Sequence, residues 1–160
     1  MKQKKTDSPA LRFKKPPHVL ILEARFYDDV NDLMIEGVKA VLKKSGATHE
    51  VVTVPGALET PAALQFHAQR KKGKKFDAFV VLGCVIRGAT THYETVCNES
   101  ARGVTDVALK LSLAVGNGIL TVENKKQALE RADAGRLDKG GGAAIAALAM
   151  LKLKRDCGLS

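Results

Sequence analysis

Residues 76–94, FDAFVVLGCVIRGATTHYE, are the most informative stretch of the chain. Its apolar run, residues 79–86, is almost unbroken and rich in valine, which is typical of a strand buried on both faces. The run stops at residues 87–90 (RGAT), and residues 91–94 (THYE) then fit a capping box, so we expect a helix to start at Thr91. The stretch therefore predicts a buried strand, a glycine-containing turn and a helix in direct succession.

The turn after this strand has the features of an anion-binding site. Its glycine exposes backbone N–H groups, and the following helix directs its partial positive charge toward the turn, so phosphate is favoured at Ala89 and Thr90. His92 falls in the first turn of the same helix, where an imidazole beside the anion can act as a proton shuttle. A histidine at a helix start is also often structural or solvated, and the residues alone leave both interpretations open.

Length and composition predict one globular domain. The chain has 160 residues, of which 45% are hydrophobic, so a sizeable core is expected. No apolar run approaches the roughly 20 residues of a membrane span, and the basic N-terminus lacks the apolar stretch of a secretory signal. The three cysteines (Cys84, Cys97 and Cys157) have no metal-ligand spacing, so we expect reduced thiols in a cytoplasmic protein without a membrane partner.

The net charge of +9 is concentrated in residues 1–16, in residues 70–75 and near the end of the chain. A tail and solvated helix ends account for such runs, whereas nucleic-acid binding requires basic residues interleaved with stacking aromatics. Aromatic residues make up 4% of the chain and are sparse in these runs, so we expect no specific nucleic-acid partner. Residues 1–16 are expected to be a flexible basic tail, or ordered only against a partner chain, and residues 17–160 to form the single domain.

Strand and helix patterns alternate along the chain, which predicts an α/β fold with a parallel sheet and helices on both faces. Ligands bind such sheets at the carboxyl ends of the strands. A loop is expected to carry Gly135, Arg136, Asp138 and Lys139, and residues 140–142 (GGG) to lead into the last helix. The expected strands are residues 18–23, 50–54, 76–86 and 115–122, and the expected helices are 28–44, 58–71, 91–112, 124–132 and 143–155.

Four further residues near strand ends or late turns can carry chemistry. Phe26 can stack on a planar heterocycle or be a core or rim aromatic, and Glu59 can accept hydrogen bonds from ligand hydroxyls or serve the helix dipole. Arg131 and Lys139 flank a glycine-containing loop; the guanidinium can pair with phosphate, although both can equally be surface cations. No Walker, dinucleotide, Ser-His-Asp or metal-cluster pattern is present, which leaves general acid–base chemistry without metal or cofactor.

Several spaced segments, taken together, resemble the 6,7-dimethyl-8-ribityllumazine synthase family, whose members catalyse the penultimate step of riboflavin synthesis. The resemblance covers residues from about 18 to 155. Several motifs in order are far more specific than any one of them. The segments are residues 25–26 (RF), 54–61 (VPGALETP), 82–93 (LGCVIRGATTHY), 118–124 (GILTVEN), 130–132 (ERA) and 139–140 (KG).

The resemblance implies a three-layer flavodoxin-like sandwich with a four-stranded parallel sheet, and a homopentamer with active sites between adjacent subunits. It implies a transferase that needs no cofactor, with His92 as the proton-transfer residue and Arg131, from the neighbouring subunit, as the second catalytic residue. The phosphate of 3,4-dihydroxy-2-butanone 4-phosphate is expected at Ala89, Thr90 and Arg131. The ribitylaminouracil is expected at Phe26, Ala57, Leu58, Glu59, Cys84, Val85, Ile86, Asn117 and Lys139.

The chain departs from the family pattern at two places. Asn117 stands where many members have phenylalanine against the pyrimidine, which motivates an alternative reading as a flavin- or lumazine-binding paralogue with weak or no turnover. The loop of residues 133–138 lacks the glycine-rich, asparagine-containing form of capsid-forming members. We therefore expect an isolated pentamer or a dimer of pentamers rather than a shell of 60 subunits.

Overall fold

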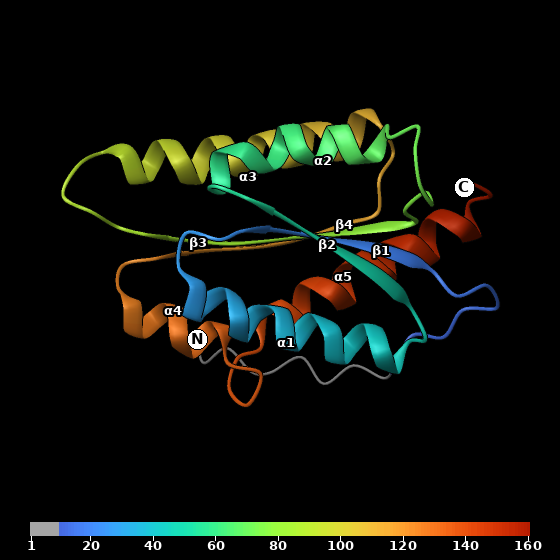
Figure 1. Cartoon of the computed structure of the whole chain (residues 1–160), viewed down its shortest axis with the longest axis horizontal. Helices are drawn as coiled ribbons and strands as arrows, with labels where there is room; N and C mark the ends of the chain where they lie inside the picture. The colour runs from blue at the N-terminus through green and yellow to red at the C-terminus, as the bar shows by residue number, and fades with distance from the viewer. Residues whose placement is uncertain (1–9) are drawn as a thin grey trace.

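The computed structural model describes residues 10–160, and Figure 1 shows how the elements are arranged. Four parallel strands form one sheet in the order β2-β1-β3-β4. The strands are β1 (His18–Ala24), β2 (Thr48–Val54), β3 (Ala78–Ile86) and β4 (Val115–Val122). The helices are α1 (Asp28–Lys44), the 3-10 turn η1 (Ala57–Glu59), α2 (Thr60–Ala68), α3 (His92–Lys110), α4 (Lys125–Ala132) and α5 (Lys139–Asp156).

Helices cover both faces of the sheet, with α2 and α3 on one face and α1, α4 and α5 on the other (Figure 1). This arrangement confirms the predicted three-layer α/β fold. The central strands are buried on both faces, because alternate side chains of β1 enter opposite cores. Ile21 packs with the α1 and α5 layer and Leu22 with the α2 and α3 layer. Burying one such side chain contributes about 1.5–3 kcal/mol.

Helix α5 begins at Lys139, so the prediction that Lys139 belongs to a loop and that the last helix begins at about Ala143 was wrong. A Cβ atom on Gly140 would lie 2.1 Å from the carbonyl oxygen of Met34 in α1. The same helix presses on the sheet, where a Cβ atom on Gly116 would lie 1.9 Å from the carbonyl oxygen of Ala143. Glycine at these positions therefore permits backbone contact between α5 and its neighbours, and this close packing outweighs the low helix propensity of glycine.

The predicted bounds of the other elements differ from the structure mainly at element ends. β2 begins two residues earlier than expected, β3 begins at Ala78, and α2 ends at Ala68. The Asn124 cap of α4 is confirmed, since its side-chain oxygen accepts a hydrogen bond from the Gln127 N–H at 3.0 Å. The expected capping box at Thr91 is absent: the Thr91 side chain makes no capping hydrogen bond, and Glu94 pairs with Arg87 instead.

The expected tail of residues 1–16 falls partly outside the described residues, which begin at residue 10. From there Leu11 and Phe13 pack against the core cluster that includes residues of α1 and α5. The Arg155 guanidinium donates a hydrogen bond to the Lys15 carbonyl oxygen at 3.0 Å. Within residues 10–160, no helix has the length and apolar character that crossing a membrane requires.

Candidate active site

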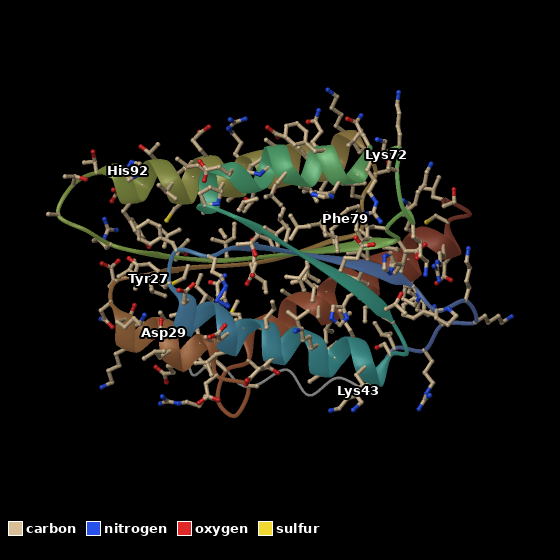
Figure 2. All side chains as sticks on the ribbon, in the orientation of Figure 1. Tyr27, Asp29, Lys43, Lys72, Phe79 and His92 are labelled. Carbon is tan, nitrogen blue, oxygen red and sulfur yellow. The ribbon has the colours of Figure 1, made fainter. Side chains whose placement is uncertain are left out.

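A cavity of about 400 Å³ opens where β1, β2 and β3 end and α3 begins. Its volume falls within the range of small-molecule sites. Tyr27 and His92 lie at the same end of the sheet (Figure 2). The cavity is lined by Phe26, Tyr27, Pro55, Gly56, Ala57, Leu58, Glu59, Cys84, Val85, Ile86, Gly88, Thr90, His92, Tyr93 and Val96.

Phe26 follows β1 at the mouth of the cavity. Its side chain is 70% exposed, and its ring meets Tyr27 edge-on with 5.0 Å between ring centroids. Tyr27 is in turn covered by the Lys125 ammonium, 4.9 Å from the ring centroid, and Lys125 is held by an ion pair with Asp29. The exposed ring of Phe26 is therefore accessible to a planar ligand, and the Tyr27 ring that it contacts is held in place by Lys125.

Residues 55–59 form the wall opposite Phe26, at the end of β2. The Thr60 hydroxyl donates to the Ala57 carbonyl oxygen at 2.7 Å, and the Glu59 N–H donates to the Gly56 carbonyl oxygen at 3.2 Å. A Cβ atom on Gly56 would lie 3.1 Å from a carboxylate oxygen of Glu59, so glycine gives this carboxylate room to lie against the turn. The wall thus combines an ordered backbone with a carboxylate acceptor.

The end of β3 supplies a largely apolar surface. Cys84 is buried, and Val85 and Ile86 are half-buried. Burial raises the pKa of the Cys84 thiol to about 11, so the thiol is neutral near pH 7. Cys84 is therefore suited to packing against a ligand and not to nucleophilic attack.

The predicted anion seat lies between β3 and α3. Residues 88–92 are exposed, and the Thr90 hydroxyl accepts a long hydrogen bond of 3.4 Å from the His92 N–H. The Thr91 side chain makes no capping hydrogen bond, and the Glu94 N–H donates to the Thr91 carbonyl oxygen at 3.1 Å. A helix start of this kind, in an exposed turn, is favourable for an anion. Thr90 and His92 thus share one cavity with the predicted ring-binding residues.

Arg87, at the end of β3, was not predicted as part of the site. Its guanidinium forms ion pairs with Glu94 and with Glu123, the latter at 2.8 Å, and lies 4.1 Å from the centroid of the Tyr93 ring. The two carboxylates raise the pKa of Arg87, and Arg87 lowers the pKa of Glu94. Two of the three guanidinium nitrogens of Arg87, Nε and Nη1, are therefore engaged by carboxylates of its own chain.

Four of the predicted residues are not part of the cavity lining formed by the described residues of this single chain. Ala89 lies in the exposed turn, and Lys139 is the first residue of α5. Arg131 is in α4, where its guanidinium donates to the Gln127 carbonyl oxygen at 3.1 Å. Asn117 is exposed on the edge strand β4, and its side-chain oxygen accepts a hydrogen bond from the Ile119 N–H at 3.0 Å. The roles expected for these four residues stay predictions.

Tyr27, Tyr93 and Val96 line the cavity but were missed in the sequence. Val96 lies four residues after His92, so helical spacing from the predicted histidine could have found it. Tyr27 follows Phe26 directly and had no comparable signal. In residues 10–160, no group of three or more His, Cys, Asp or Glu side chains is placed to hold a metal ion.

Residues 16–155 match the family model described as 6,7-dimethyl-8-ribityllumazine synthase. The enzyme of that name from Sphingopyxis alaskensis is 58% identical over 142 residues, covering 89% of this chain and 98% of the relative. The Nitrobacter winogradskyi enzyme is 55% identical over 139 residues, covering 86% of this chain and 85% of the relative. 6,7-Dimethyl-8-ribityllumazine synthase 1 of Rhizobium meliloti is 55% identical over 146 residues, covering 90% of this chain and 95% of the relative. The chain therefore belongs to the 6,7-dimethyl-8-ribityllumazine synthase family.

Proposed function

We propose that the protein condenses 5-amino-6-(D-ribitylamino)uracil with (S)-3,4-dihydroxy-2-butanone 4-phosphate to give 6,7-dimethyl-8-ribityllumazine, phosphate and water. Membership of the family supports this reaction. The observation that carries it is one cavity in which Phe26, residues 57–59 and residues 84–86 meet Thr90 and His92. A ring-binding surface and an anion seat thus adjoin, as a reaction between a heterocyclic amine and a phosphorylated ketone requires.

The reaction needs proton transfer and close positioning of two substrates. The ring amine attacks the ketone at C2 and loses water to form an imine. Removal of the C3 proton expels phosphate from C4, and the enol that results tautomerises to a carbonyl at C3 and a methyl group. The ribitylamino nitrogen then attacks this carbonyl and closes the ring with loss of a second water. Holding both substrates side by side can supply on the order of 7–11 kcal/mol. His92, at the edge of the anion seat, is the residue we assign to proton transfer.

The uracil derivative is assigned to the larger part of the cavity. The exposed ring of Phe26 stacks on the pyrimidine, and the Glu59 carboxylate accepts hydrogen bonds from the ribityl hydroxyls. Residues 84–86 supply the apolar floor and backbone groups at the end of β3. Asn117 and Lys139 are assigned to the same substrate from an adjacent subunit.

The phosphate is assigned to Ala89 and Thr90 at the start of α3, with Arg131 of a neighbouring subunit as its cation. Two observations support an incoming cation. The described lining of the cavity includes no lysine or arginine, and the nearby Arg87 is already paired with two carboxylates. A homopentamer with shared sites supplies the missing charge, and we propose an isolated pentamer or a dimer of pentamers.

A flavin- or lumazine-binding paralogue with weak turnover is the second candidate. Asn117 favours it, because an amide whose oxygen is engaged by Ile119 offers no aromatic face for stacking. Incubating the purified protein with both substrates and following lumazine fluorescence separates the candidates. Product formation well above the uncatalysed rate is expected. Tight riboflavin binding without product would contradict the enzymatic proposal and favour the paralogue.

A further inference from the structure

The turn that forms the anion seat, residues 88–92, makes few stabilising interactions of its own. These residues are exposed, and the Thr91 side chain makes no capping hydrogen bond at the start of α3. The two ends of the turn are nevertheless joined, because Arg87 at the end of β3 forms an ion pair with Glu94 in the first turn of α3. A second ion pair joins Arg87 to Glu123, just beyond β4. We call Arg87, Glu94 and Glu123 the Arg87 clasp.

The Arg87 clasp also controls the charge beside the anion seat. Glu94 belongs to the first turn of the helix whose N–H groups face the seat, so a bare carboxylate there would repel a bound phosphate. Glu123 adds a second negative charge to the same cluster. One guanidinium neutralises one of these charges and holds both carboxylates toward itself, and its stacking on Tyr93 fixes its position.

We propose that Arg87 is a positioning residue for the phosphate-bearing substrate: it covers the charge of Glu94 and Glu123 and thereby keeps the anion seat at the start of α3 attractive to phosphate. This inference rests on the proposed function and adds a residue to it. Arg87 is assigned no contact with the phosphate, because it is outside the described cavity lining and its Nε and Nη1 atoms are engaged by the clasp. Its effect on binding is exerted through the two carboxylates.

Arg87 can act by neutralising the charge of Glu94 and Glu123, or only by holding the turn in place. Variants that lack the two carboxylates distinguish these two roles. Arg87→Met leaves Glu94 and Glu123 uncovered, and should raise both the KM for the butanone phosphate and the inhibition constant of inorganic phosphate about three- to tenfold. The KM for the uracil substrate should change less than about twofold. The defect should shrink as salt rises, since the carboxylates are partly exposed.

The decisive variant is Arg87→Met/Glu94→Gln/Glu123→Gln, which lacks the guanidinium and both charges. Its phosphate affinity should return to within about threefold of wild type. Arg102→Met is the matched control, because Arg102 also bridges two carboxylates, Glu99 and Asp106, but farther along α3. This control should leave both KM values unchanged.

Persistence of the full defect in the triple variant, with an unchanged melting temperature, would overturn the proposal. If the triple variant does not fold, Glu94→Gln/Glu123→Gln keeps Arg87 and provides the second test. It should bind inorganic phosphate at least as tightly as wild type, and weaker binding would contradict charge covering. A wild-type protein that forms no lumazine would refute the proposed function itself, an outcome distinct from an active wild type whose Arg87 variants behave normally.

Discussion

His92 and Arg131 lie on opposite sides of the sheet within one chain. His92 begins α3, which covers the same face as α2, whereas Arg131 is in the last turn of α4, which packs beside α1 on the other face (Figure 1). The cavity that contains His92 is lined, among the described residues, without Arg131. This arrangement supports the proposal that a site which uses both residues for one phosphate combines two subunits.

His92→Ala should lower kcat by about 10²-fold, because the imidazole is the proposed proton shuttle of the site. The inhibition constant of inorganic phosphate should change much less than kcat. His49→Ala is the matched control, since His49 is an exposed histidine on β2 outside the described cavity lining. Steady-state kinetics with both substrates make the comparison. Equal kcat values for wild type and His92→Ala would remove His92 from the mechanism.

Phe26→Leu should raise the KM for the uracil substrate about three- to tenfold, because the proposed stacking interaction is worth about 0.5–1.5 kcal/mol beyond area burial. The side chain is 70% exposed, so the melting temperature should change little. Phe66→Leu removes a comparably exposed ring, 71%, from outside the cavity and should leave this KM unchanged. The stacking role is refuted if both variants bind the uracil substrate equally well.

Gly116→Ala should destabilise the fold by about 1–3 kcal/mol, since the added Cβ would lie 1.9 Å from the Ala143 carbonyl oxygen and would push α5 off β4. Gly142→Ala provides the contrast within α5, because no atom lies within 4 Å of its added Cβ. That variant should gain up to about 1 kcal/mol from helix propensity. Denaturant unfolding measures both changes, and a neutral Gly116→Ala would contradict the close approach of α5.

Glu50 should make stability depend on acid pH. The Arg70 guanidinium, followed by His18, lowers the pKa of this carboxyl from 4.5 to about 2. A depressed folded-state pKa stabilises the fold above pH 4.5, and this contribution is lost as the pH falls toward about 2. The difference in unfolding free energy between wild type and Glu50→Gln should therefore shrink on acidification. A difference that is independent of pH would contradict the role of this ion pair.

Local patterns predicted the elements that local interactions determine. The bounds of α1 and β4 agree with the sequence interpretation, and the Asn124 cap was recognised from its spacing to Gln127. The start of α5 was not predicted, because three successive glycines indicate a loop unless the backbone contact with Met34 is known. The start of α5 is determined by tertiary packing, which cannot be read from a single sequence.

The candidate site was predicted to the extent that it lies at strand ends. Phe26, residues 57–59, residues 84–86, Thr90 and His92 share a cavity because parallel strands place their carboxyl ends at one edge. The Arg87 clasp was missed because Glu123 is 36 residues from Arg87 and approaches it only through the pairing of β3 with β4. Residues assigned to a second subunit are beyond what one chain can bring together.

Subunit mixing tests the shared site most directly. His92→Ala and Arg131→Ala protomers, each of low activity alone, are denatured, mixed in equal amounts and refolded together. Random assembly places an intact His92 beside an intact Arg131 at about a quarter of the interfaces, so activity should recover to about a quarter of the wild-type value. Activity that remains at the level of the separate variants, in an assembly shown by light scattering to be mixed and oligomeric, would contradict an active site built from two subunits.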